Sequence, residues 1–202
     1  MPIFVYLFDV LGVVPSSTKI TINLLLQSFF NQVTAFGGGN DTVTVAWPGG
    51  IPTLGSADLL LYYFRSPFSL MIQAQSATGK IPAEGAGLTI FGGPLGTLSE
   101  LRPTPVIGNP QVVTNLTFHE LMHNRLQMGD SLLHSGDGLA VADPSFATLS
   151  TANKAAMAPV LSSPISQFTQ GMTILSNDLS AQNSNDPLAA ATVPWADINV
   201  GQ

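Results

Sequence analysis

The stretch that decides the fold is LTFHELMHNRLQMG, residues 116–129. It contains the pattern H-E-x-x-H, in which two histidines four positions apart lie on one face of a helix. His119 and His123 can therefore bind one metal ion with their imidazoles. Glu120 stands next to the first histidine and can take the proton of a metal-bound water molecule, which is hydrolase chemistry. The pattern predicts one Zn²⁺ ion, two of its ligands and a general base.

We expect this helix to start at Thr114 or Asn115, either of which can cap it, and to end before Gly129. The chain has three histidines, and all of them fall between His119 and His134. A solvated helix that carries its histidines by chance is the alternative interpretation. A protein that uses histidine as an ordinary polar residue would scatter it along the chain, so the pattern favours a metal site.

Catalytic zinc sites usually have three protein ligands and one open position. His134 is the expected third ligand, because a chain that leaves the helix at Gly129 can turn back toward the metal. Asp130, near the helix end, and Asp137, in a Gly-Asp-Gly turn, are the alternatives. A glutamate elsewhere in the chain, or no third protein ligand, is a further alternative. The chain has no cysteine, which excludes disulfides and thiolate ligands.

The rest of the chain predicts strands and helices in alternation. Strands are expected at residues 2–14, 41–47, 57–65 and 87–91, and helices from about residue 16 to 36, at 148–158 and at about 164–180. Residues 66–86 are expected to be irregular, the proline- and glycine-rich residues 92–110 to be mostly loop, and the tail from residue 182 to pack loosely. Because no repeat or linker divides the 202 residues, we expect a single domain, residues 1–202.

Composition limits the partners. Only 9% of the residues are charged, the net charge is −6, and the six lysines and arginines are scattered. They cannot form the basic surface that nucleic acid or an anionic membrane needs, so neither is an expected partner. No apolar run reaches the roughly 18 residues of a membrane span. The apolar start of the chain lacks the features of a secretory signal peptide. Its location therefore stays open between the cytoplasm and export by a dedicated secretion system.

HELMH, the downstream His134 and the later segment AAMAP, Ala155 to Pro159, together resemble the zincin metallopeptidases, and within them the metzincin clan. In that clan a methionine lies in a tight turn beneath the metal, and Met157 is similar to it; an ordinary core methionine is the alternative. The spacing differs from the clan motif H-E-x-x-H-x-x-G-x-x-H. Here the glycine follows His123 by six residues instead of three, and the third histidine by eleven instead of six.

The resemblance implies an α+β fold of two lobes. The upper lobe, residues 1–129, would hold a mixed sheet, a backing helix and the active-site helix, and the small lower lobe, residues 130–202, would end in a C-terminal helix. An edge strand would bind an extended substrate by strand addition. The candidate strand is Gly87, Leu88, Thr89, Ile90 and Phe91. The oxyanion would be stabilised by Arg125 or by backbone N–H groups.

Together these inferences predict a zinc-dependent metallopeptidase in which Glu120 activates a zinc-bound water molecule against a peptide or protein substrate. The alternative is a binding or structural protein in which zinc ties a loop to the helix, and four protein ligands would close such a site. A third interpretation, compatible with the first, is a toxin or effector delivered by a secretion machine. The sequence does not determine the oligomeric state.

Overall fold

A computed structural model of the chain describes residues 1–9, 12–63, 87–91, 96–103, 106–177 and 199–200. The strands are β1 (Pro2–Phe8), β2 (Thr42–Ala46), β3 (Leu59–Tyr63), β4 (Gly87–Phe91), β5 (Leu98–Leu101) and β6 (Asn199–Val200). The helices are α1 (Ser16–Phe36), α3 (Pro110–Leu126), α4 (Asp130–Leu133), α5 (Thr151–Met157) and α6 (Gln170–Asn177), with 3₁₀ turns η2 (Gly138–Ala140) and η3 (Ala158–Val160). This mixture of strands and helices agrees with the expected α+β class.

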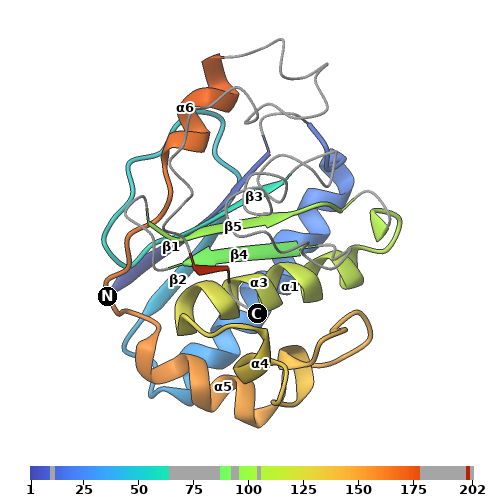
Figure 1. The fold of residues 1–202 in the computed structure, drawn as a ribbon, viewed down its shortest axis with the longest axis vertical. Coiled ribbons are helices and arrows are strands. Elements are labelled where there is room, and N and C mark those ends of the chain that lie inside the picture. The colour runs from blue at the N-terminus through green and yellow to red at the C-terminus, as the bar shows by residue number, and fades with distance from the viewer. Residues whose placement is uncertain (10–11, 64–86, 92–95, 104–105, 178–198, 201–202) are drawn as a thin grey trace.

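The described strands form one mixed sheet in the order β2-β1-β3-β5-β4-β6 (Figure 1). β1 is parallel to both β2 and β3, and β5 is parallel to β3. β4 is antiparallel to β5 and to β6. The first three elements therefore form a βαβ unit, in which α1 connects two parallel neighbours.

The first strand is shorter than the expected 2–14, and Asp9 explains why. Its carboxylate accepts hydrogen bonds from the backbone N–H groups of Val13 and Val14 at 2.8 and 3.1 Å, and it forms a 2.8 Å ion pair with Lys19. A side chain that bonds the following backbone competes with the sheet and favours a turn. The turn brings the chain directly to α1, whose N-cap position is Pro15.

Two helices cover one face of the sheet. α1 packs against β2, α3 packs against β3, β4 and β5, and the two helices contact each other. Alternate residues of β1 and one stripe of α1 meet in this core, in which Phe118 of α3 also packs against Phe29 and Phe30. α5 contacts both helices from below, so α3 is held on several sides (Figure 1).

The opposite face of the sheet is also covered where β3 lies, because all five residues of β3 are buried. The hydroxyl group of Tyr62 donates a 2.8 Å hydrogen bond to the carbonyl of Phe168, just before α6. Burial on both faces is the environment of a central strand in a largely parallel sheet. This explains why the apolar run Leu59 to Tyr63 has no polar alternation.

Several expected boundaries were wrong. Residues 92–110 are not all irregular, because β5 lies among them with every residue buried. α6 begins at Gln170, later than the expected residue 164, and Figure 1 shows it at the end of the molecule opposite α4 and α5 instead of closing a lower lobe with them. The expected irregular residues 66–86, the end of the 57–65 strand and the tail up to residue 198 lie outside the described residues. In the described part, no helix has the length and apolarity to cross a membrane.

Candidate metal centre

Helix α3 begins earlier than the sequence predicts. Asn109 is its N-cap and accepts a 3.3 Å hydrogen bond from the backbone N–H of Val112, and Pro110 follows at the first helical position. Thr114 and Asn115, the expected caps, lie inside the helix. The Thr114 hydroxyl group donates to the carbonyl of Pro110. The Asn115 amide donates to the carbonyls of Pro144, Ser145 and Ala147. Asn115 therefore anchors the loop after η2 to α3.

The chain reverses directly after α3. Gln127 has a left-handed backbone, with φ of 53°, and its N–H bonds the carbonyl of His123 at 3.0 Å. Gly129 is the N-cap of the short helix α4, and His134 is its C-cap. The backbone N–H of His134 donates a hydrogen bond to the carbonyl of Asp130. This reversal accommodates the eleven-residue spacing between His123 and His134, because α4 brings the third histidine back over α3.

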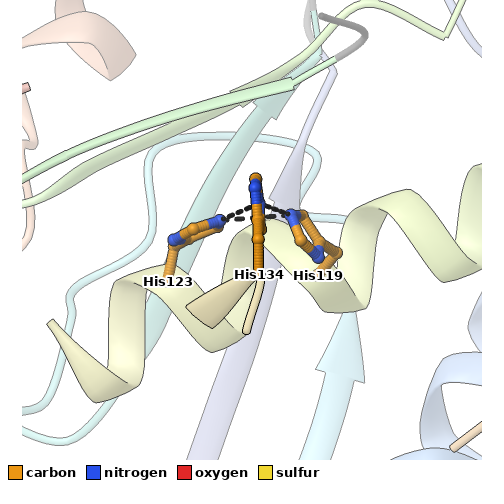
Figure 2. A group of neighbouring side chains, drawn as sticks. All are labelled: His119, His123 and His134. Carbon is orange, nitrogen blue, oxygen red and sulfur yellow. Dashed lines mark hydrogen bonds between the residues drawn. The ribbon is translucent and has the colours of Figure 1, made fainter. Parts of the chain in front are cut away.

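The three histidines converge through the same atom of each ring (Figure 2). The Nε2 atoms of His119 and His123 are 3.1 Å apart, those of His119 and His134 3.2 Å, and those of His123 and His134 3.3 Å. Ligands about 2.0–2.1 Å from a tetrahedral zinc ion lie about 3.4 Å from one another. The three nitrogens are thus spaced as ligands of one ion, and His134 takes the expected third place.

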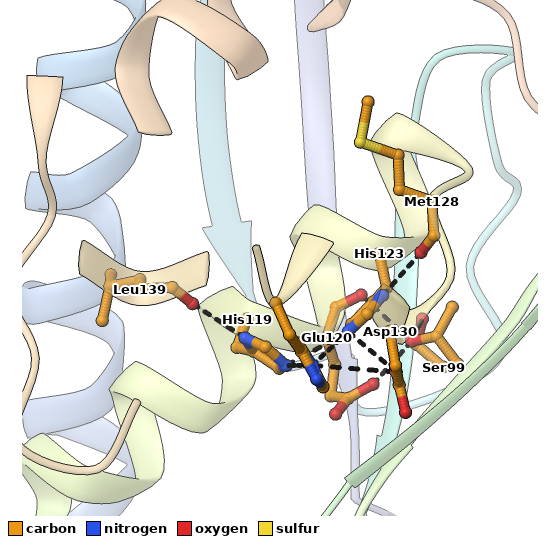
Figure 3. Close-up of polar contacts among 9 residues, drawn as sticks. Ser99, His119, Glu120, His123, Met128, Asp130 and Leu139 are labelled. Carbon is orange, nitrogen blue, oxygen red and sulfur yellow. Dashed lines mark hydrogen bonds and ion pairs between the residues drawn. The ribbon is translucent and has the colours of Figure 1, made fainter. Parts of the chain in front are cut away.

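Backbone carbonyls orient two of the rings (Figure 3). Nδ1 of His119 lies 2.7 Å from the carbonyl oxygen of Leu139, and Nδ1 of His123 lies 2.6 Å from that of Met128. Because a carbonyl oxygen only accepts, both Nδ1 atoms carry the proton, and both Nε2 lone pairs point at the centre of the cluster. Lone pairs at such short range repel one another unless a cation lies between them. The arrangement therefore fits a metal ion, whose identity the three imidazoles do not decide.

The electrostatics also suit a metal. Burial, with a smaller contribution from the neighbouring His123, lowers the pKa of His119 to about 3, and burial also lowers the pKa of His123. Both imidazoles are therefore neutral at neutral pH. A neutral imidazole is the form that binds metal, so the site needs to release little or no proton from these two rings.

The carbonyl that orients His119 is itself held in place. Asn153 of α5 accepts a 2.8 Å hydrogen bond from the backbone N–H of Leu139 and donates one to the carbonyl of Asp137. Asn153 also forms a reciprocal capping box with Ser150 at the start of α5. Gly138 has φ of +55°, and a Cβ atom there would lie 2.5 Å from Oδ1 of Asn153, so the turn requires glycine. α5 thus positions His119 through the η2 turn.

Glu120 is buried under strand β4. Its Oε2 atom accepts a 2.7 Å hydrogen bond from the hydroxyl group of Thr89, which also lies 2.9 Å from the hydroxyl group of Ser99. A Cβ atom on Gly87 would lie 2.3 Å from Oε1 of Glu120, so only glycine lets the strand approach this closely. Burial raises the pKa of Glu120 to about 8, the hydrogen bond from Thr89 opposes this shift, and the charge of Asp130 adds to it.

The residues expected to bind substrate as an edge strand have a different environment. On the side away from β5, β4 pairs with β6, through Ile90 with Val200 and Phe91 with Asn199. This stretch of β4 is therefore not a free edge, which corrects the expectation for Ile90 and Phe91. Leu88 is buried, and the other two residues of the strand, Gly87 and Thr89, contact Glu120.

Arg125 is not part of the centre. Its guanidinium donates to the carbonyls of Ala57 and Ser163, and burial lowers its pKa to about 10. It lines a pocket with Thr97 and Gln127 near the end of α3, and no histidine borders that pocket. Arg125 follows His123 by two residues, which puts it on the other side of the helix. The prediction that it stabilises an oxyanion is therefore wrong, and its role is to tie α3 to two loops.

The remaining candidate site residues differ in how close they lie to the three histidines. Oδ1 of Asp130 lies 3.6 Å from Nε2 of His123 and 3.7 Å from Nε2 of His134. Asp137 instead accepts a hydrogen bond from the hydroxyl group of Ser150 and is not grouped with the histidines. Met157 is fully buried in the core at the end of α5, which continues directly into η3. Its role as a Met-turn beneath the metal stays a prediction.

Sequence reasoning missed the residues that support the ligands. The carbonyls of Leu139 and Met128, the Asn153 amide and the Thr89 hydroxyl group have no recognisable motif, since their roles arise from tertiary contacts. One local signal was present, because Ser150 and Asn153 have the spacing of a capping box. Comparison of the chain with models of protein families, with curated proteins and with solved structures finds no match.

Proposed function

We propose that this protein is a zinc-dependent metallopeptidase of zincin type, related in its site to the metzincins, which hydrolyses peptide bonds in a peptide or protein substrate. One observation carries the proposal. Three buried or half-buried imidazoles direct Nε2 atoms 3.1–3.3 Å apart to one point, and Glu120, the residue after the first ligand, lies beside them (Figure 3). A metal that served structure alone would not need this carboxyl group.

The roles of the residues follow from their contacts. His119, His123 and His134 would hold the ion, which when bound would polarise the scissile carbonyl and acidify a water molecule. Glu120 would accept the proton of that water and pass it to the leaving amine. Thr89 holds one oxygen of Glu120 at 2.7 Å, which restricts the carboxyl group to a single orientation. Because Glu120 is buried, bulk water is excluded from the side of its carboxyl group that faces away from the proposed metal position.

Replacing Glu120 by glutamine tests the reaction. The protein is loaded with one equivalent of Zn²⁺ and incubated with a quenched-fluorescent peptide library and an unfolded protein. We expect Glu120→Gln to keep its zinc, measured by elemental analysis, and to lose cleavage by about 10²–10⁴-fold, the usual contribution of a general base. A chelator should abolish cleavage by the parent protein, and added Zn²⁺ should restore it.

Asp143→Asn is the matched control, because it removes the same charge from an exposed loop residue. It should cleave like the parent. Equal cleavage by the parent and Glu120→Gln would refute the proposal, whatever the metal content of the two proteins.

A further inference from the structure

Asp130 lies beside two of the three histidines that could hold the metal. Its Oδ1 atom is 3.6 Å from Nε2 of His123 and 3.7 Å from Nε2 of His134. Ligand atoms of a tetrahedral ion are about 3.4 Å apart at zinc–ligand distances of 2.0–2.1 Å. Asp130 is not among the side chains whose ligand atoms all lie within 4.8 Å of one another, which are the three histidines. Rotation of the aspartate side chain toward His119 would therefore have to bring Oδ1 to the fourth vertex of the tetrahedron begun by the three nitrogens.

The surroundings of Asp130 favour a ligand that can leave. Its side chain is half-exposed, at 50%, whereas that of His123 is 5% exposed. Its backbone is fixed, because Asp130 opens α4 and its carbonyl accepts a 2.8 Å hydrogen bond from the N–H of His134. Its carboxylate lies within 4 Å of Nε2 of both His123 and His134. The backbone of Asp130 is thus fixed, whereas its carboxyl group is half-exposed to solvent and can rotate about the side-chain bonds.

The two carboxyl groups at the centre differ in how they are held. Asp130 and Glu120 both lie beside the imidazoles (Figure 3). Glu120 is held at 2.7 Å by Thr89 and keeps its position as a base. Asp130 is therefore the carboxylate that is free to approach the ion.

We propose that Asp130 is the fourth ligand of the metal ion in the resting protein and leaves it when a substrate or an anion binds. The departure of Asp130 for a substrate rests on the proposed peptidase function, whereas its coordination of the metal does not. Asp130 then regulates access to the open position on which hydrolysis depends. It also explains how a site with four protein ligands can still be catalytic.

Cobalt replaces zinc in the experiment, because the visible absorption of Co²⁺ reports its ligands. The parent, Asp130→Ala and Asp130→Asn are each loaded with one equivalent of Co²⁺ and titrated with azide. Asp130→Ala should shift the cobalt bands and bind azide at least tenfold more tightly than the parent, because no protein ligand has to leave. Asp130→Asn, with a weaker oxygen ligand, should lie between them. Asp143→Ala, which removes an exposed aspartate, should behave like the parent.

Two results would overturn the inference. Identical cobalt spectra and azide affinities in the parent and Asp130→Ala would show that Asp130 does not bind the metal. Failure of both Asp130 variants to bind Co²⁺, with unchanged circular dichroism, would make Asp130 an obligatory ligand instead of one that leaves. Neither result depends on Glu120. If Glu120→Gln cleaved like the parent while Asp130→Ala shifted the cobalt bands, the proposed peptidase function would be wrong. The assignment of Asp130 as a metal ligand would still hold.

Discussion

The hydroxyl group of Thr89 holds the carboxyl group of Glu120 from strand β4, at 2.7 Å. Thr89→Val keeps the shape of the side chain and removes this hydrogen bond. A buried hydrogen bond to a charged group contributes about 1.5–3 kcal/mol. We therefore expect kcat to fall about ten- to a hundredfold, with KM little changed, because in the proposed reaction Glu120 acts on the chemical step and not on substrate binding. Steady-state cleavage assays measure the two constants.

Thr89→Ser supplies the control for this prediction, since it restores a hydroxyl group at the same position. It should recover most of the lost kcat. A similar loss in Thr89→Ser and Thr89→Val would mean that the methyl group, through packing, matters more than the hydrogen bond.

Glu120 makes the stability of the metal-free protein depend on pH. Its pKa is raised from 4.5 to about 8, so the folded state keeps a proton that the unfolded state releases above pH 4.5. The stability that this provides is full below pH 4.5 and is lost as pH rises toward 8, by at most about 1.4 kcal/mol per pH unit. His119 has the opposite sign, because its lowered pKa costs stability only as pH falls below 6.5. Between pH 6.5 and 8 the effect of Glu120 is therefore isolated.

Urea unfolding of the chelator-treated protein at pH 6.5 and 8 checks this. The parent should lose about 2 kcal/mol over this range, and Glu120→Gln should lose much less, because an amide does not ionise. Parallel pH profiles for the two proteins would contradict the prediction.

At the scale of elements, α5 supports the metal centre without contributing a ligand. Asn153 completes the capping box of α5 with Ser150. Its side chain also accepts a hydrogen bond from the backbone N–H of Leu139, whose carbonyl orients His119. Asn153→Ala should therefore weaken metal binding about 10–100-fold, the usual effect of removing the support of a ligand. Ser150→Ala removes part of the same cap and should cost about 0.5–2 kcal/mol of stability with a smaller change in metal affinity. Competition with a fluorescent zinc chelator measures the affinity, and equal affinities in Asn153→Ala and the parent would contradict this role.

The strength of local patterns decides which elements the sequence predicts. The apolar run of β1, the alternation of β2 and the helical spacing of α1 predict those elements, because each pattern lies in one continuous stretch of sequence. β5 could not be predicted, since Leu-Ser-Glu-Leu at residues 98–101 has no β-branched residue and buries Ser99 and Glu100. Its strand conformation comes from its neighbours β3 and β4. The start of α3 was missed for the opposite reason, because Asn109 and Pro110 lie in a stretch whose composition indicates a loop.

The same contrast holds for the site. H-E-x-x-H predicts two neighbouring imidazoles and an adjacent carboxyl group from helix geometry alone. Proximity of His134 could be expected from the concentration of histidines, but the reversal at Gln127 and the helix α4 that achieve it could not. Arg125 was misassigned because sequence gives a residue's position along a helix, and the contacts of its guanidinium with Ala57 and Ser163 are made across the fold.

At the scale of the molecule, the metal should stabilise the fold. A ligand that binds only the folded state at 100 times its Kd contributes about 2.7 kcal/mol. For a chain of this length that corresponds to a rise in Tm of roughly 5–10 °C. Thermal unfolding with one equivalent of excess Zn²⁺ and with chelator should show this difference. His123→Asn should unfold at the same temperature in both conditions, and a zinc effect that persisted in this variant would place the metal elsewhere.

The three histidines of the candidate metal centre are close in the chain as well as in space, since His119 and His134 are 15 positions apart. The sheet is different, since Tyr62 of β3 pairs with Glu100 of β5 and Phe4 with Thr44 of β2. Closing a short loop costs less chain entropy than joining distant strands and is faster. An ion present during synthesis would therefore find its site within the α3–α4 segment before the sheet is complete. Metal supply would then affect the order of folding as well as the final stability.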